Sequence, residues 1–222
     1  MVLDNYRSTL DWWLVPLAKV FRRVHPDVFT WASLAMAVLG GIAFWRSSAS
    51  PAGLQLLLWA WVCVGLNSIL DLLDGKIAQM TGKATPRGDF LDHAVDRFSD
   101  TAFIAGIAFS PWASPSLGLA ALAGTLLTSY MGTQAQAVGL KRHYGGLLGR
   151  ADRMVLLLAV PLAQALWSAW SGAATFMLAG HAVTLLGVLL GYFALVGAFT
   201  TLQRFIGTLR GFGPDGRLRR DP

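Results

Sequence analysis

The sequence predicts an all-α integral membrane protein with six transmembrane helices and an N-terminal amphipathic helix at the membrane interface. Three observations predict this fold class: an apolar composition, long uncharged segments, and an uneven distribution of basic residues. Of the 222 residues, 55% are hydrophobic and 14% are charged, whereas soluble domains are about 45–50% apolar and roughly 25% charged. The positive mean hydropathy of +0.52 also indicates a chain more apolar than a soluble domain. The one cysteine, Cys63, lies in an apolar segment, which excludes a disulfide framework.

Long apolar segments predict the membrane helices. Residues 28–45 carry no charged side chain and are long enough to cross a hydrocarbon core of about 30 Å. The five further predicted spans are residues 53–73, 90–109, 116–139, 151–170 and 174–203. We expect three regions: a juxtamembrane segment at 1–27, a six-helix membrane domain at 28–208, and a basic cytoplasmic tail at 209–222.

The distribution of the 18 lysines and arginines predicts the orientation. Only Arg46 lies in the turns after the first, third and fifth spans; the other 17 lie at the opposite ends of the spans or in the terminal regions. Basic residues favour the cytoplasmic side, so we expect a multi-pass protein of the cell membrane with both termini in the cytoplasm. A net charge of +6 is typical of nucleic-acid binding or of an anionic membrane surface. The hydropathy favours the membrane, and no nucleic-acid partner is expected.

The segment before the first span combines aromatic and basic residues. Residues 5–23 include Trp12, Trp13 and Leu17 together with Lys19 and Arg22. This composition is typical of an amphipathic helix lying in the interface. The first residues lack the order of charged and apolar regions that marks a cleavable signal peptide, so none is expected.

Two pairs of aspartates are the main candidate site. All twelve acidic residues are aspartate. Asp71 and Asp74 are three residues apart at the end of the second predicted span, and Asp92 and Asp96 are four apart where the third begins. Each pair shares one face of a helix. With an intervening loop of about fourteen residues, an antiparallel arrangement of the two helices would bring four carboxylates together.

Four neighbouring carboxylates require a cation, because they cannot all stay ionised without one. Oxygen ligands of this charge suit Mg²⁺ or Mn²⁺, which also bind substrate phosphates, and two ions fit the cluster. One aspartate could take a proton from an attacking hydroxyl. Asp89 and Asp100 extend the same face, and we expect structural or solvent-exposed roles for them. Ionisable residues at membrane depth also occur in transporters, so a divalent-cation transporter is an alternative of another class.

These residues resemble the CDP-alcohol phosphotransferase family, whose pattern is D-x2-D-G-x2-A-R-x8-G-x3-D-x3-D. The positions that match, with every spacing correct, are Asp71, Asp74, Gly75, Ala78, Gly88, Asp92 and Asp96. At the position of the pattern's arginine the chain has Gln79. The resemblance implies that an alcohol hydroxyl displaces CMP from a CDP-linked donor, and it implies a homodimer. A family member that has lost activity through Gln79 is a further alternative.

The resemblance also implies roles for individual residues. Asp71, Asp74 and Asp92 would bind metal, and Asp96 would bind metal and act as the general base. The CDP donor would contact residues of both motif halves: Asp71, Gly75, Ala78, Gln79 and Gly88.

A second, basic cluster suggests the acceptor. Its residues are Lys141, Arg150, Arg153 and Arg204, and arginine suits bidentate binding of phosphate. The spacing Arg150-x-x-Arg153 and the Gln203-Arg204 pair resemble the phosphatidylinositol-phosphate synthase branch and its archaeal relatives, although Gly149 replaces that branch's common glutamate. The resemblance implies a phosphorylated polyol such as inositol phosphate as the acceptor.

Other interpretations of the acceptor side remain open. Cytoplasmic loops are basic in any case, and basic residues also bind anionic lipid headgroups. Within the same reaction class, the small polar alcohol could be glycerol phosphate or serine, or the donor could be a soluble CDP-polyol rather than a CDP-linked lipid.

Overall fold

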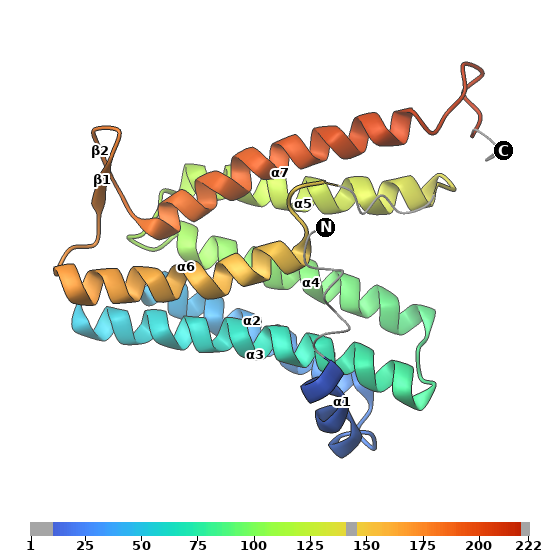
Figure 1. Cartoon of the computed structure of the whole chain (residues 1–222), viewed down its shortest axis with the longest axis horizontal. Helices are drawn as coiled ribbons and strands as arrows, with labels where there is room; N and C mark the ends of the chain where they lie inside the picture. The colour runs from blue at the N-terminus through green and yellow to red at the C-terminus, as the bar shows by residue number, and fades with distance from the viewer. Residues whose placement is uncertain (1–10, 141–145, 219–222) are drawn as a thin grey trace.

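A computed structural model describes residues 11–140 and 146–218. In these ranges the chain forms seven α-helices and one short β-hairpin. The elements are α1 (Asp11–Val20), α2 (Pro26–Arg46), α3 (Pro51–Thr81), α4 (Pro86–Ala108), α5 (Pro115–Ala137), α6 (Arg150–Ser171), β1 (Phe176–Leu178), β2 (His181–Val183) and α7 (Leu185–Leu209). Helices α2 to α7 run along the long axis of the molecule, and α1 lies beside the end of α3 (Figure 1).

Similar residue pairs begin three of the long helices. Ser50, Thr85 and Ser114 each precede a proline, and each side chain accepts a hydrogen bond from a backbone N–H of the first turn. Such hydroxyl caps satisfy one of the free N–H groups, and the fixed φ of proline suits the first helical position. The Thr85 cap bonds to the N–H of Gly88 at 3.1 Å. It therefore fixes the start of α4, less than two turns before Asp92.

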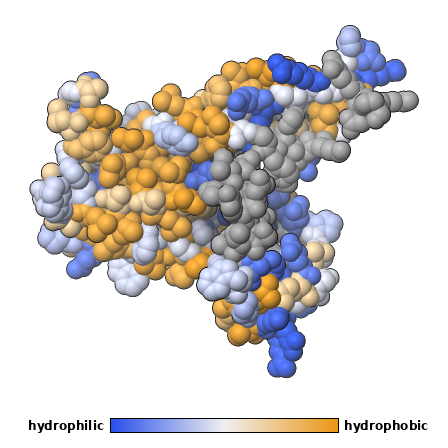
Figure 2. Space-filling view, in the orientation of Figure 1, coloured by the Kyte–Doolittle hydropathy of each residue, from blue (hydrophilic) through white to orange (hydrophobic). Residues whose placement is uncertain are grey.

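Four helices are long and apolar enough to cross a membrane, namely α2, α3, α6 and α7. They correspond to the predicted spans at 28–45, 53–73, 151–170 and 174–203. In α4 the aspartates and arginines lower the hydropathy. Figure 2 shows a hydrophobic surface over much of the length of the bundle, with hydrophilic residues near α1 and the C-terminal part of α7. Large apolar side chains are exposed, such as Leu195 at 76% exposure and Trp59 at 64%, as a lipid-facing surface requires.

Two expected boundaries are wrong. Helix α3 continues to Thr81 and ends at Gly82, which has a φ of +66°, so the first aspartate pair lies inside the helix. Only four residues, 82–85, separate α3 from α4, instead of about fourteen. The last helix begins at Leu185 rather than at 174, because residues 176–183 form a hairpin that turns at Ala179 and Gly180, both with positive φ.

Glycines allow two close helix contacts. A Cβ atom added at Gly106 of α4 would lie 2.3 Å from the carbonyl oxygen of Gly41 in α2. At Gly197 of α7 it would lie 2.8 Å from the carbonyl carbon of Gly124 in α5. Small residues permit such approaches between membrane helices. The α2–α4 contact holds the helix that carries Asp92 and Asp96 in the bundle.

Helix α1 packs against the end of the bundle through a small apolar cluster. Its buried Leu14 and Ala18 contact the region formed by Phe29, Leu73 and Ile77. An ion pair between Asp11 and Lys76 of α3, at 2.6 Å, adds a polar contact. The predicted amphipathic helix is therefore present over Asp11–Val20, and it lies against the segment of α3 around Asp74.

Candidate functional site

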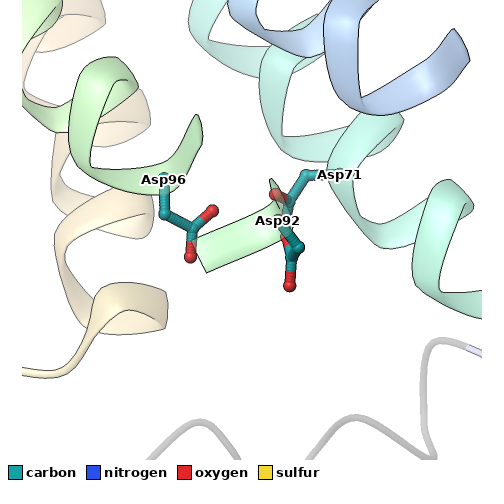
Figure 3. A group of neighbouring side chains, drawn as sticks. All are labelled: Asp71, Asp92 and Asp96. Carbon is teal, nitrogen blue, oxygen red and sulfur yellow. The ribbon is translucent and has the colours of Figure 1, made fainter. Parts of the chain in front are cut away.

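Three of the four predicted aspartates form one group. Asp71 projects from α3, and Asp92 and Asp96 project from α4 (Figure 3). Each offers a carboxylate oxygen, and these three oxygens lie within 4.8 Å of one another. The spacing of four residues in α4 places Asp92 and Asp96 on one helix face, as the sequence predicts.

Asp74 is not among these three grouped carboxylates, and it contacts α2. Its Oδ2 accepts a 2.5 Å hydrogen bond from Oγ1 of Thr30, and the residue is 5% exposed. The sequence gives no signal for the partner Thr30, because the contact joins residues 44 positions apart. The metal-binding role predicted for Asp74 stays a prediction. The hydrogen bond ties its carboxylate to the N-terminal part of α2.

Arg150, at the start of α6, joins two of the grouped aspartates. Its Nη1 lies 2.5 Å from Oδ2 of Asp71, and its Nη2 lies 2.5 Å from Oδ1 of Asp96. Asp71 and Asp96 are both largely buried, with 12% and 6% of their side chains exposed. The arginine compensates part of the negative charge, which would otherwise be costly in this position. The sequence placed Arg150 on the acceptor side, and the structure places it against the aspartates.

The grouped carboxylates fit a divalent cation. Oδ1 of Asp71 is buried and makes no hydrogen bond in the described structure, although buried polar atoms are usually bonded. Asp92 is more open, with 37% of its side chain exposed. Three carboxylates with oxygens this close provide the hard, anionic ligands that Mg²⁺ and Mn²⁺ prefer. This one group of three carboxylates accounts for a single ion, and a second ion stays a prediction.

The residues predicted to contact the CDP donor lie beside the aspartates on α3 and at the start of α4. Gly75 and Gln79 are exposed, and Ala78 and Gly88 are half-buried. A Cβ atom at Gly75 would meet no described atom within 4 Å. Helix packing therefore does not require glycine there, and the surface next to Asp74 is open to a ligand. The donor contacts themselves stay predictions.

The residues predicted for the acceptor phosphate have different partners where the structure describes them. Lys141 lies outside the described residues. Arg153 is 2% exposed, and its Nη2 lies 2.7 Å from Oδ2 of Asp100. Arg204 donates a 2.6 Å hydrogen bond to the carbonyl oxygen of Thr128. Their role in acceptor binding remains a prediction.

Arg204 also lines a cavity of about 540 Å³. The other lining residues are Gly146, Leu147, Gln203, Ile206, Gly207 and Arg210. The cavity thus lies between the segment that precedes α6 and the C-terminal half of α7. Two arginines and a glutamine give it the donors that an anion needs.

Comparison with known proteins identifies the family. The model of the CDP-alcohol phosphatidyltransferase family matches residues 23–202. The phosphatidylinositol phosphate synthase of Cutibacterium acnes is 30% identical over 223 residues, covering 94% of this chain and 98% of that protein. The archaetidylinositol phosphate synthase of Aeropyrum pernix is 30% identical over 167 residues, covering 72% of this chain and 79% of that one.

Solved structures agree with the sequence comparison. The Mycobacterium tuberculosis phosphatidylinositol phosphate synthase with CDP-DAG bound has a TM-score of 0.68 at 26% identity, covering 95% of this chain and 99% of that one. The same protein in complex with manganese and citrate has a TM-score of 0.69 at 24% identity, covering 94% and 93%, which supports the fold. The spacing of the aspartate motif, the group that three of its carboxylates form and the match over most of the chain agree: this multi-pass membrane protein belongs to the CDP-alcohol phosphatidyltransferase family and is a transferase.

Proposed function

We propose that the protein transfers a phosphatidyl-type group from a CDP-linked lipid to inositol phosphate or a similar phosphorylated polyol, releasing CMP. The observation that carries the proposal is the group of Asp71, Asp92 and Asp96 in the spacing of the family motif. The donor class is supported by the related structure with CDP-DAG bound. The acceptor is supported by relatives named for the synthesis of phosphorylated inositol lipids.

In this proposal the aspartates bind metal and one of them moves a proton. Asp71, Asp74, Asp92 and Asp96 hold Mg²⁺ or Mn²⁺, as one ion or two. A metal ion bound there would neutralise negative charge on the diphosphate and on the leaving CMP. Asp96 accepts the proton of the attacking acceptor hydroxyl as the oxygen–phosphorus bond forms and the bond to CMP breaks. The related structure in complex with manganese supports this class of ion.

The donor and the acceptor approach from different sides of the aspartates. Gly75, Ala78, Gln79 and Gly88 face the nucleotide, and the lipid chains of the donor stay in the bilayer. The acceptor phosphate binds the basic residues, of which Arg204 lines the cavity beside the C-terminal half of α7. Because α4 and α5 lie in the same bundle as the four apolar helices, we propose that they also span the membrane, with the site facing the cytoplasm. A homodimer stays a prediction.

The alternatives to the proposed function are a cation transporter and the same reaction with another acceptor or donor. Family membership decides against a divalent-cation transporter. Glycerol phosphate and serine remain alternative acceptors, and a soluble CDP-polyol remains an alternative donor. Serine lacks a phosphate, so it would not use the bidentate contacts that arginine makes with a phosphate.

The experiment measures CMP release by the purified protein in detergent with CDP-diacylglycerol and Mg²⁺ or Mn²⁺. Inositol phosphate, glycerol phosphate and serine are supplied separately, each carrying a radiolabel. We expect CMP and a labelled lipid with inositol phosphate, and much slower turnover with the others. Preferential labelling from glycerol phosphate or serine would replace the proposed acceptor. No CMP release with any acceptor or with a soluble CDP-polyol would contradict the reaction and would indicate a family member inactivated at Gln79.

A further inference from the structure

A second group of charged side chains, Arg97, Asp100 and Arg153, adjoins the aspartate group. Asp100 follows Asp96 by one turn of α4, and Arg153 follows Arg150 by about one turn of α6. The side chains of Asp100 and Arg153 are 1% and 2% exposed, and they form an ion pair at 2.7 Å. The sequence suggested only a structural or solvent-exposed role for Asp100. A fully buried aspartate that faces an equally buried arginine excludes the solvent-exposed role.

Arg97 connects Asp96 of the aspartate group with Asp100. Its Nη2 lies 3.3 Å from Oδ2 of Asp96, and its Nη1 lies 3.4 Å from Oδ2 of Asp100. It also donates a hydrogen bond to Oγ of Ser129 in α5. The contacts therefore run from Arg153 through Asp100 and Arg97 to Asp96.

Asp96 consequently has two cationic neighbours, Arg97 and Arg150. Each positive charge beside a carboxylate competes with a metal ion for it. Asp100 limits this competition, because one carboxylate oxygen faces both Arg97 and Arg153. A buried arginine without a carboxylate partner is costly. Without the charge of Asp100, Arg153 would lose its described carboxylate partner, and Arg97 would keep only its contact with Asp96.

We propose that Asp100 is a positioning residue for the metal site: it holds Arg97 and Arg153 so that Asp96 keeps its carboxylate available to the metal. The inference rests on the proposed metal binding by Asp71, Asp92 and Asp96. It adds a residue outside the family motif to the set that determines metal affinity. Partners that hold metal ligands in place commonly change affinity by about 10- to 100-fold when removed.

Binding of Mn²⁺ to the detergent-purified protein tests this without turnover. The free ion is followed by electron paramagnetic resonance as protein is added. We expect Asp100→Asn to weaken Mn²⁺ binding about tenfold. Asp89→Asn is the matched control, because Asp89 lies on the same helix with 74% of its side chain exposed; it should bind as the wild type does.

A charge-balanced variant separates positioning from general damage. Asp100→Asn combined with Arg153→Gln removes one buried charge of each sign, and its affinity should return to within about threefold of the wild type. If Asp100→Asn alone does not fold, the double variant is compared with Arg153→Gln. The double variant should then bind Mn²⁺ about threefold more weakly, because Arg97 has lost its second carboxylate.

The outcomes distinguish this inference from the proposed function. Wild-type protein that binds no Mn²⁺ would overturn the metal site and the inference together. Wild-type binding that Asp100→Asn leaves within twofold, despite a lower melting temperature, would overturn the positioning role alone. Equal affinities of the double variant and Arg153→Gln would do the same where the single variant does not fold.

Discussion

At the scale of single residues, the four motif aspartates are not equivalent. Asp96 is almost completely buried and has two arginine neighbours, whereas 37% of the Asp92 side chain is exposed. Asp74 is hydrogen-bonded to Thr30. The same residue type therefore meets three environments. The buried Asp96 is the one in which loss of charge should affect chemistry most, because its carboxylate serves both metal and proton transfer in the proposed reaction.

Asp96→Asn should abolish CMP release and leave the fold intact. The amide has the size of the carboxylate, but it cannot take a proton and is a poor ligand for a hard cation. We expect a loss of at least about a hundredfold in kcat, since general base catalysis alone contributes roughly 10²–10⁴-fold. The measurement is CMP release, with the melting temperature as a check on folding. Asp89→Asn serves as the control, and activity of Asp96→Asn near the wild-type rate would remove Asp96 from the mechanism.

Gln79→Arg restores the one motif position that departs from the family pattern. Gln79 is exposed on α3, so the longer side chain has room. A guanidinium can bind a diphosphate through two charge-assisted hydrogen bonds. We expect the KM for CDP-diacylglycerol to fall about tenfold, which corresponds to roughly 1.4 kcal/mol.

Gln79→Met is the matched control, because it keeps the length and removes the hydrogen bonds without adding charge. It should raise the KM or leave it unchanged. A KM that is the same in Gln79→Arg and the wild type would show that position 79 does not contact the donor.

The residues of the site were only partly predictable from the sequence. The spacing in α4 predicts that Asp92 and Asp96 share a face, because helix periodicity is local. The contacts of Arg150 with Asp71 and Asp96, and of Arg153 with Asp100, join residues more than 50 positions apart. Nothing in the local pattern specifies such partners. Basic residues near a cytoplasmic loop have several explanations, so their actual neighbours emerge only once α6 is placed against α3 and α4.

At the scale of elements, hydropathy located the helices better than it located their ends. The span predicted at 28–45 corresponds to α2 at Pro26–Arg46, and that at 151–170 to α6 at Arg150–Ser171. Helix α3 runs eight residues past its predicted end because Asp74, Lys76 and Gln79 lower the hydropathy without breaking the helix. The hairpin at 176–183 was missed for the opposite reason, since its residues are apolar while Ala179 and Gly180 turn the chain.

The contact between α2 and α4 should not tolerate a side chain at Gly106. The Cβ atom of Gly106→Ala would lie 2.3 Å from the carbonyl oxygen of Gly41, so the two helix backbones must separate. We expect a destabilisation of about 1–3 kcal/mol, as for other overpacked contacts. It should appear as a lower melting temperature of the purified protein in detergent.

Gly191→Ala provides the comparison. Gly191 lies in α7, and a Cβ atom there would meet no described atom within 4 Å. Alanine favours a helix over glycine by roughly 0.5–1 kcal/mol, so this variant should melt at the wild-type temperature or slightly above it. Equal melting temperatures for the two variants would mean that α2 and α4 pack less closely than described.

At the scale of the whole molecule, charge and hydropathy together define a direction across the membrane. Hydrophilic residues gather near α1 and the C-terminal part of α7, and hydrophobic residues cover much of the length of the bundle (Figure 2). The turn between α2 and α3 and the turn between α3 and α4 lie at opposite ends of α3. The basic residues Lys76, Lys83 and Arg87 lie near the second turn, toward the same end of α3 as the proposed active site. A cytoplasmic acceptor therefore requires that this end face the cytoplasm.

Labelling of single cysteines tests this orientation. In a Cys63→Ser background, Lys83→Cys lies between α3 and α4, Ala49→Cys lies between α2 and α3, and Asp215→Cys lies after α7; all three positions are exposed. A membrane-impermeant maleimide should label positions 83 and 215 in inside-out vesicles and position 49 in right-side-out vesicles, because basic residues remain on the cytoplasmic side. Labelling after detergent solubilisation controls for reactivity at each position. Labelling of 49 and 83 from the same side would mean that α3 does not cross the membrane, and the reverse pattern would place the aspartates on the side away from a cytoplasmic acceptor.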